Sequence, residues 1–230
     1  MKIAVIHQPQ YLPYLGFFHK LNQGDVFVVM DSVQFQRRGI QHRNKIKTNK
    51  GEQWLTVPVF HSSGEEERID QVKIDSELPW SRKHWQTLLT NYSPAPYFEK
   101  YAGKLQELLG KKWHHLWELD MALIQWVMEI LEIDKPIVYL SSLEVEGSKS
   151  ELLIDACKAV GADTYLSGSG GKRYMDMSAF EAAGIGIIWQ EFNSPSYVQL
   201  FPELGFLPNL SILDTLFCCG LETRKFLELN

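Results

Sequence analysis

The sequence has no long hydrophobic run and few cysteines, and each shortage excludes a class of protein. An apolar run such as Val26–Met30 is far shorter than the roughly 18–20 residues that a membrane span needs. The three cysteines, Cys157, Cys218 and Cys219, provide no disulfide framework, and we expect them to be small buried side chains. The polar residue His7 comes too early for a secretory signal. We therefore expect a cytoplasmic chain without a membrane span.

Basic residues are also fewer than acidic residues. The chain has 23 Lys and Arg against 28 Asp and Glu, a net charge of −5, which argues against nucleic-acid binding by bulk electrostatics. The HExxH, GxSxG and paired-cysteine zinc patterns are absent, so we expect no metal site and neither metalloprotease nor α/β-hydrolase chemistry. The sequence identifies no cofactor and no oligomeric state.

What is present is an alternation of strand and helix patterns. A 45% hydrophobic share is ordinary for a globular protein and leaves enough chain for a buried core. The apolar run 3–6, the helical pattern 14–21 and the apolar run 25–30 predict a βαβ unit. The alternation predicts an α/β fold, Rossmann-like, with a mostly parallel sheet. Later elements are predicted as strands at 137–140, 164–166 and 186–189, and as helices at 151–160, 178–183 and 209–220.

The middle of the chain interrupts this alternation. A basic segment, 32–60, ends on a strand pattern in which Gly51 suits a hairpin turn, and Val72–Ile74 is a further short strand candidate. Residues 79–133 then carry three helical patterns, beginning near Trp80, Phe98 and His115. We expect a single domain over residues 1–230, with a helical insertion at about 79–133.

The loop after the first strand is the first candidate site, because ligands of open parallel sheets bind beyond the carboxyl ends of the strands. His7 stands at that end, and Gly16 near the start of the next helix would let an anion approach the helix amides. We expect Gln8, Gln10 and Tyr11 of this loop to bind substrate. A structural histidine in a proline-stiffened loop is the alternative.

The second candidate is the carboxylate at the end of the next strand and the basic segment behind it. Asp31 precedes a cluster of basic residues, a combination suited to an anionic or amino-bearing ligand. Arg43 and Asn44 adjoin the following strand and are expected to point inward. The alternative for each of these residues is a solvated face.

A glycine-rich turn is the third candidate. Ser167–Gly171 leaves a predicted strand, and Gly168, Gly170 and Gly171 would expose backbone amides to an oxyanion, with Lys172 adding charge and Tyr174 lining the pocket. The turn matches neither the P-loop nor the GxGxxG pattern, so it supports neither of those nucleotide-binding modes. A plain tight turn is the alternative. Together the three loops predict one pocket.

A combined pattern extends over nearly the whole chain. It consists of residues 7–18, Asp25, 31–35, Arg43-Asn44, 54–59, 165–171, Tyr174, 190–192, Tyr197 and 210–214. This pattern resembles the WbqC-like proteins. That resemblance implies an accessory enzyme of O-antigen and other surface-polysaccharide gene clusters, with a proposed role in attaching an amino acid such as glycine to the amine of a modified sugar.

A more distant likeness is to nucleotidylyltransferases and class I tRNA synthetases, which carry an HxGH motif between the first strand and its helix. Here Tyr14 and Phe17 stand in place of the two histidines, so the cations of that motif are missing. Gly147-Ser148-Lys149-Ser150 is similar to their second, lysine-serine motif over four residues. The fold can be shared while the chemistry is not.

Three functions are consistent with these patterns. The first is a transferase that forms an amide between an activated acyl or aminoacyl donor and an amine on a nucleotide-linked sugar, with His7 as general base and Asp31 orienting the amine. Arg43, Lys172 and the Gly168–Gly171 amides would hold a phosphate or an oxyanion. The second is a nucleotidylyl- or adenylyl-transferring enzyme that uses ATP or CTP. The third is a non-catalytic binding protein of a polysaccharide assembly complex.

Overall fold

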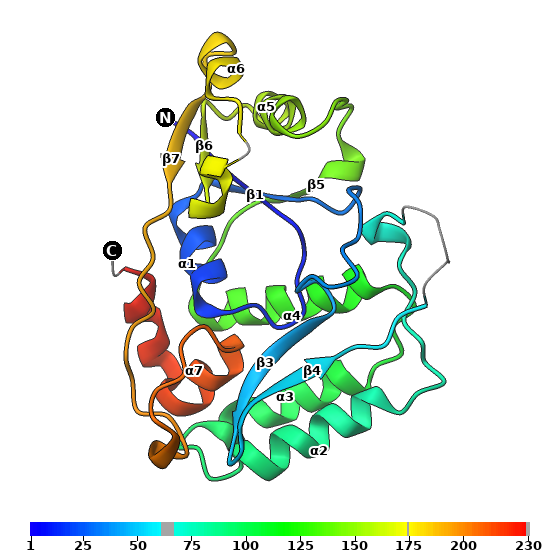
Figure 1. The fold of residues 1–230 in the computed structure, drawn as a ribbon, viewed down its shortest axis with the longest axis vertical. Helices are drawn as coiled ribbons and strands as arrows, with labels where there is room; N and C mark the ends of the chain where they lie inside the picture. Colours follow the sequence, from blue (N-terminus) through cyan, green and yellow to red (C-terminus); the bar gives the residue numbers. More distant parts are fainter. Residues whose placement is uncertain (61–66, 174, 229–230) are drawn as a thin grey trace.

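A parallel sheet forms the centre of the protein in the computed structural model, which describes residues 1–60, 67–173 and 175–228 (Figure 1). Within these residues five strands pair in parallel in the order β5-β2-β1-β6-β7. The prediction of an α/β, Rossmann-like fold is confirmed. The strands are β1 (Ile3–His7), β2 (Val26–Val29), β5 (Ile137–Tyr139), β6 (Thr164–Ser167) and β7 (Gly186–Trp189).

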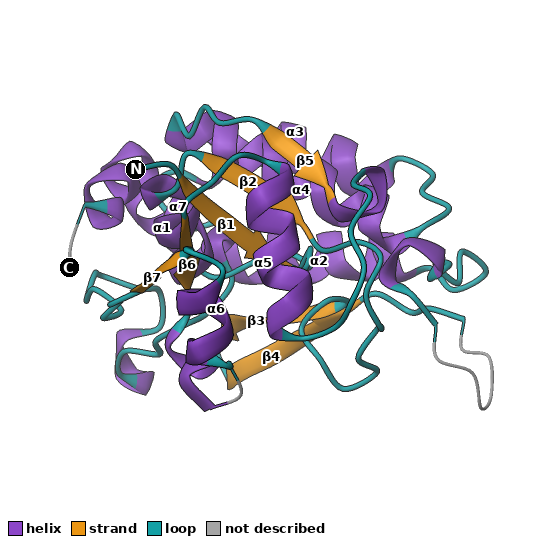
Figure 2. Ribbon diagram, turned by 90° about the horizontal axis from the view of Figure 1, so that it is seen from above, coloured by secondary structure: helices purple, strands orange, loops and turns teal. Residues whose placement is uncertain are grey.

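Helices cover both faces of this sheet, because side chains alternate between the faces along each strand. Ala4 and Ile6 of β1 belong to a hydrophobic cluster with α5 and α6, whereas Val5 belongs to the larger cluster with α1, α4 and α7. Figure 2 shows α5 and α6 on the side of the sheet that faces the viewer. The helices are α1 (Leu15–Gln23), α2 (Trp80–Tyr92), α3 (Phe98–Gly110), α4 (Leu116–Leu131), α5 (Ser150–Ala159), α6 (Met177–Ala182) and α7 (Ile212–Cys219).

An antiparallel hairpin contributes Ile46 and Leu55 to the larger cluster and is hydrogen-bonded to α2, since the Lys47 amide donates to the Tyr92 hydroxyl (Figure 1). It consists of β3 (Arg43–Thr48) and β4 (Gly51–Thr56), and Gly51 takes a φ of +103° at the turn, a conformation that glycine adopts at little cost. The three helices predicted between 79 and 133 form, and each begins within one residue of its expected start. The basic segment therefore supplies a hairpin, and the segment after it supplies three helices.

Two predicted elements differ from the structure. Val72–Ile74 forms no strand, and its residues make only isolated bridges, Val59 to Ile74 and Lys73 to His115. The helix predicted from 209 begins three residues later, because the Ser211 hydroxyl caps it by accepting a hydrogen bond from the Leu213 amide.

The strand order places a crevice at the carboxyl ends of β1 and β6. Helix α1 follows β1 over one face of the sheet, while α6 follows β6 over the other. Two helices that depart from neighbouring strands to opposite faces leave an opening between them, and this is where open α/β sheets bind ligands.

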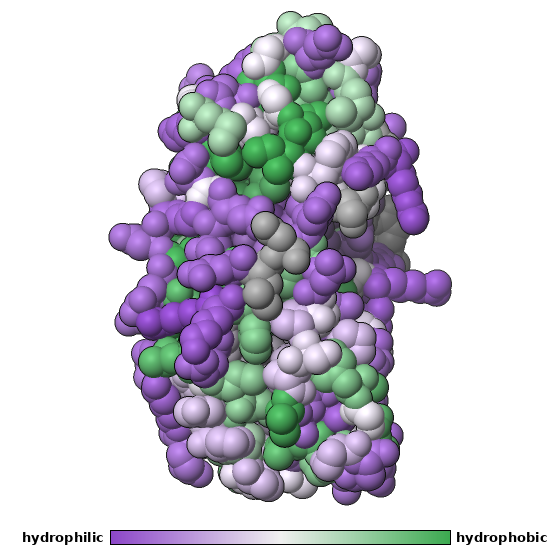
Figure 3. Space-filling model, turned by 90° about the vertical axis from the view of Figure 1, so that its left-hand side faces the viewer, coloured by the Kyte–Doolittle hydropathy of each residue, from purple (hydrophilic) through white to green (hydrophobic). Residues whose placement is uncertain are grey.

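Figure 3 shows a largely hydrophilic side of the molecule, with hydrophobic side chains gathered toward the end that carries α6 and β7. Across the described ranges, no helix has both the length and the apolarity needed to cross a bilayer.

Candidate functional site

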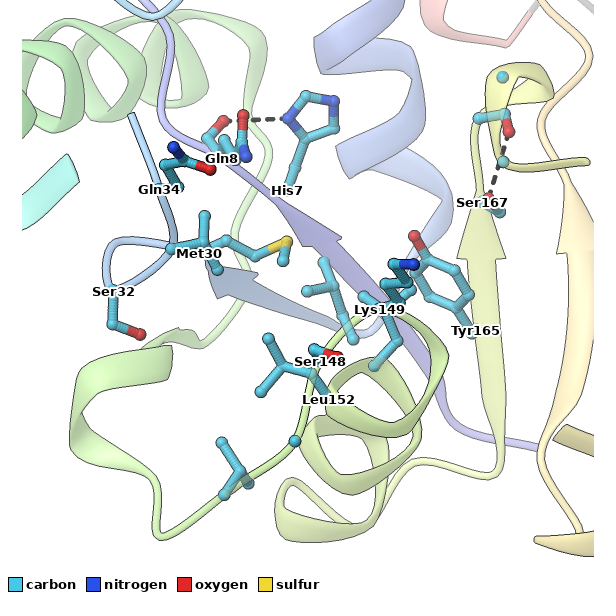
Figure 4. Close-up of a pocket in the computed structure, with 18 of the residues that line it drawn as sticks. His7, Gln8, Met30, Ser32, Gln34, Ser148, Lys149, Leu152, Tyr165 and Ser167 are labelled. Atoms are coloured by element: carbon cyan, nitrogen blue, oxygen red, sulfur yellow. Dashed lines mark hydrogen bonds between the residues drawn. The ribbon is translucent and has the colours of Figure 1, made fainter. Parts of the chain in front are cut away.

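A cavity of about 1000 Å³ opens at the crevice between β1 and β6, and we call it the switch-point cavity. Its walls come from the ends of β1 and β6, from the segments that follow β2, and from the turn before α5. Figure 4 shows His7, Gln8 and Gln34 on one side, Ser148, Lys149 and Tyr165 on the other, and Met30 between them. The structure thus brings His7, Gln8, Gly168, Gly170 and Gly171 to one cavity, as the sequence predicts.

The switch-point cavity is positively charged. Lys20, Arg68 and Lys149 line it, and none of its described lining residues is acidic. Arg68 is already paired, since its guanidinium donates to Asp70 at 2.5 and 3.1 Å. The available cations are therefore Lys20 and Lys149, and the cavity suits an anion.

Lys20 is the feature of this cavity that sequence reasoning missed. The side chain is only 4% exposed, and within residues 1–60, 67–173 and 175–228 it has no hydrogen bond and no ion pair. Burial lowers the pKa of Lys20 to about 8. Keeping a buried ammonium protonated without a partner is costly, so an anion beside Lys20 would lower that cost.

The signal for Lys20 was available in the helical pattern. Lys20 lies three residues after Phe17 and next to Leu21, on the buried face of α1, where a lysine breaks an otherwise apolar stripe.

His7 is held as a neutral imidazole. Its Nδ1 donates to the Gln8 carbonyl at 2.9 Å, which leaves Nε2 as the unprotonated nitrogen, and the ring meets Phe17 edge-on at 5.0 Å. Burial, with the Lys20 charge as a second cause, lowers the pKa of His7 to about 3. At neutral pH the ring is therefore a proton acceptor rather than a cation. The amide nitrogen of Gln10, which is itself buried, lies 3.3 Å from Nδ1.

The turn before α5 supplies the second available cation. Lys149 immediately precedes the helix and takes a φ of +53° with a ψ of −121°, a conformation that is strained for a residue with a Cβ. Such strain is concentrated at ligand sites, where the surrounding structure maintains it. The lysine and the amino end of a ten-residue helix thus border the same cavity.

Two predicted substrate contacts are occupied within the fold. Asp31 is 3% exposed, and its carboxylate accepts hydrogen bonds from the Ser141 amide at 2.9 Å and from the Ser141 hydroxyl at 2.5 Å. Tyr11 is fully buried, with its hydroxyl 2.9 Å from His84 Nδ1. Asp31 therefore joins β2 to the segment after β5, and Tyr11 does not line the cavity. Both are corrections to the sequence-based site.

Gly16 is also a correction. A Cβ at this position would lie 2.4 Å from a ring carbon of Tyr14 and 2.8 Å from one of Phe192. Gly16 therefore lets two aromatic rings pack on α1, and these rings occupy the space where an anion was expected.

The remaining predicted cations lie away from the switch-point cavity. Arg43 donates to the backbone carbonyls of Arg38 and Gly39 at 2.7 and 3.3 Å, and Lys172 extends over the Trp189 ring at 5.3 Å. Asn44 is buried, donates to the Leu12 carbonyl at 2.7 Å and borders a different cavity. Tyr174 lies outside the described residues. Arg43 and Lys172 thus do not line the switch-point cavity, whereas Lys20 and Lys149 do.

The glycine-rich turn forms a short 3-10 helix, Ser169–Arg173, instead of an open nest of amides. The Gly171 amide donates to the Gly168 carbonyl at 3.0 Å, so it is not free for an oxyanion. A Cβ on Gly171 would lie 2.3 Å from the Ser167 Oγ and 2.9 Å from the Met175 sulfur. A Cβ added to Gly170 would meet no atom within 4 Å, so the two glycines have different roles.

We therefore expect Gly171→Ala to lower the free energy of unfolding by about 1–3 kcal/mol, because the added methyl overpacks the turn. Gly170→Ala is the matched control and is expected to change it by less than about 0.5 kcal/mol. Urea unfolding of both variants measures the difference, and equal stabilities would contradict the packing role of Gly171.

In the part of the chain that the structure describes, no group of three or more His, Cys, Asp or Glu side chains is placed to hold a metal ion.

Comparison with known proteins assigns the chain to a family. The model of the WbqC-like protein family matches residues 8–226. The chain belongs to the WbqC-like protein family. This WbqC-like protein is also 32% identical over 230 residues to the uncharacterized protein Rv1507c of Mycobacterium tuberculosis, an alignment that covers 99% of this chain and 98% of the relative. No solved structure matches it.

The distant likeness to HxGH enzymes gains no support from these comparisons. In this WbqC-like protein Tyr14 packs edge-on against Phe192 at 6.0 Å, and Phe17 packs against His7 at 5.0 Å. Both positions are filled by aromatic packing, and the charge of the site comes from elsewhere.

Proposed function

We propose that this WbqC-like protein is a cytoplasmic transferase of cell-surface polysaccharide biosynthesis. It forms an amide between an activated acyl or aminoacyl donor, such as a glycyl donor, and an amine on a nucleotide-linked sugar. The observation that carries the proposal is the pairing, in one cavity at the sheet's switch point, of a buried ammonium without a partner, Lys20, and a neutral imidazole, His7.

The cations fit the phosphates of the substrate. Lys20 gains the partner that it lacks, and Lys149 with the amino end of α5 adds a second positive region in the same cavity. A nucleotide-linked sugar carries two linked phosphates, and the cavity volume of about 1000 Å³ is at the upper end of the range for small-molecule sites.

The imidazole fits the amine. In amide formation the neutral amine nitrogen attacks the acyl carbonyl carbon, the bond from that carbon to the leaving group breaks, and the nitrogen loses one proton. His7 Nε2 accepts that proton from the adduct. Because the pKa of His7 is about 3, the proton passes on to the leaving group or to solvent instead of remaining on the ring.

The affinity for a phosphate-bearing ligand should depend on pH through Lys20. The free protein holds Lys20 protonated below its pKa of about 8 and loses that charge as the pH rises through it. We expect the Kd for a nucleotide-linked sugar to be flat from pH 6 to 7.5 and to rise at most about tenfold per pH unit above 8. Isothermal titration across this range measures it. Lys20→Arg keeps its charge, so a rise that persists in this variant would contradict the assignment.

A thermal-shift comparison tests the function itself, because a ligand that binds only the folded protein raises its melting temperature. The ligands are UDP- and dTDP-linked amino sugars, ATP, CTP, glycine and acyl-CoA, each with and without magnesium. We expect stabilisation by a nucleotide-linked amino sugar without magnesium, lost in Lys20→Met and kept in Lys104→Met, an exposed lysine. No shift with any nucleotide-linked sugar would contradict the proposal.

Nucleotidylyl transfer is the second candidate, and one observation favours it. Lys149, from the short lysine-serine motif, lines the same cavity as Lys20. This function requires stabilisation by ATP or CTP together with magnesium, which the same comparison detects.

A further inference from the structure

A second cavity lies on the other side of the glycine-rich turn. It measures about 720 Å³ and is formed between the β3–β4 hairpin, the start of α1, the segment after β7 and the segment before α7. We call it the hairpin cavity. Gly168 and Gly170 line both cavities, so the turn forms their common border.

The lining of the hairpin cavity is aromatic. Tyr14, Trp54 and Phe192 contribute rings, and Trp54 is 43% exposed although it is a large apolar side chain. Two cations of β3 fix this ring, with Arg43 Cζ at 4.6 Å and Lys45 Nζ at 5.3 Å from its centroid. A positioned, exposed ring at the edge of a cavity is a surface for the apolar face of a ligand.

The hairpin cavity has no net charge, in contrast to the switch-point cavity. Among its described lining residues the only charged pair is Lys45 and Glu52, which bond to each other at 2.5 Å. This cavity therefore does not favour a phosphate. It suits a neutral or weakly charged group.

Several polar atoms in the hairpin cavity remain available. Gln190 donates its amide to the Gly16 carbonyl at 2.7 Å, and its Oε1 has no hydrogen bond within the described ranges. The side-chain amide of Asn209 and the hydroxyl of Tyr14 likewise have no hydrogen-bond partner among the described residues. Amides and a hydroxyl beside aromatic rings can match the hydroxyls and the apolar face of a sugar ring together.

The two cavities meet beside His7. β1 and β6 pair in parallel register, with Val5 opposite Leu166. His7 and Gly168 follow this pair by two residues each, both line the switch-point cavity, and Gly168 lines the hairpin cavity as well. A ligand that crosses the turn thus passes the proton acceptor.

We propose that the hairpin cavity binds the sugar ring of the nucleotide-linked amino sugar, with the ring against Trp54, the phosphates in the switch-point cavity and the amine at the border beside His7. The proposal rests on the proposed function for the phosphate end of the substrate, while the sugar subsite stands on the hairpin cavity's own lining.

Indole NMR signals test this subsite. The chain has seven tryptophans, so a ¹⁵N-labelled sample gives seven indole N–H signals, and that of Trp54 is assigned by its loss in Trp54→Leu. The probe is the methyl glycoside of glucosamine, which carries no phosphate. We expect it to shift the Trp54 signal, and we expect Trp54→Leu to weaken its binding about tenfold, while Trp54→Phe keeps most of it.

Lys20→Met separates the two proposals. The methyl glycoside should bind this variant as it binds the unmodified protein, whereas UDP-glucosamine should lose affinity. If UDP-glucosamine binds the unmodified protein but neither ligand shifts the Trp54 signal, the sugar subsite is overturned and the proposed function stands. If the glycoside shifts Trp54 while no nucleotide-linked sugar binds, the subsite stands and the proposed function fails.

Discussion

Lys20→Met is expected to make the ligand-free protein more stable and to abolish its stabilisation by a nucleotide-linked sugar. Burial lowers the pKa of Lys20 from 10.5 to about 8, and the side chain is 4% exposed. A shift of this size corresponds to a cost of up to about 3 kcal/mol for keeping the ammonium protonated in the folded state. Methionine fills similar space without the charge, so we expect the free energy of unfolding to rise by up to about that amount at pH 7.

The cost of the buried Lys20 ammonium to the free energy of unfolding depends on pH. The unfolded chain binds more protons than the folded one between pH 8 and 10.5, so the cost is fully present below pH 8 and disappears as the pH rises to 10.5. Urea unfolding of both proteins at pH 7 and pH 10 measures the difference, with Lys104→Met as the exposed control. If Lys20→Met were destabilising at pH 7, or still stabilised by the nucleotide-linked sugar, Lys20 would not be a vacant anion site.

Asp214→Ala is expected to lower the free energy of unfolding by about 3–5 kcal/mol, because it breaks a buried polar network that contains a charge. The Asp214 carboxylate accepts from the Tyr92 hydroxyl at 2.7 Å, the Tyr197 hydroxyl at 2.8 Å and the Gln199 amide at 3.0 Å. Gln199 in turn accepts from Lys47, which is fully buried. Removal of the carboxylate takes one hydrogen-bond acceptor from the two tyrosine hydroxyls and from the Gln199 amide, and it removes a negative charge that interacts with Lys47.

Chemical denaturation measures this loss, and Asp214→Asn provides the matched control. The asparagine keeps one acceptor oxygen and the shape of the side chain, so we expect it to lose less stability than the alanine. A loss below about 1 kcal/mol in Asp214→Ala would contradict the view that this network joins α7, α2 and the hairpin.

The sequence was sufficient to predict the parallel sheet and the position of the switch-point cavity. Short apolar runs separated by helical patterns predicted the parallel strands. His7 is a polar residue directly after such a run, so its position at the carboxyl edge of the sheet could be predicted. The glycines after β6 were placed correctly for the same reason. These inferences need only local pattern and the geometry of parallel sheets.

The individual roles were less predictable, because polar side chains find partners far along the chain. Asp31 bonds to Ser141, 110 residues away, and Tyr11 to His84, 73 residues away. No local pattern distinguishes a carboxylate that awaits a ligand from one that a distant hydroxyl satisfies. Lys20 is the opposite case, since its place on a buried helix face could be read from spacing, but its lack of a partner could not.

A crystal structure with UDP-glucosamine tests the central claim most directly. The account predicts a phosphate oxygen within about 4 Å of the Lys20 Nζ, inside the switch-point cavity, with the amino group at the border formed by Gly168 and Gly170. A complex in which the nucleotide binds away from Lys20, with the switch-point cavity empty, would contradict it.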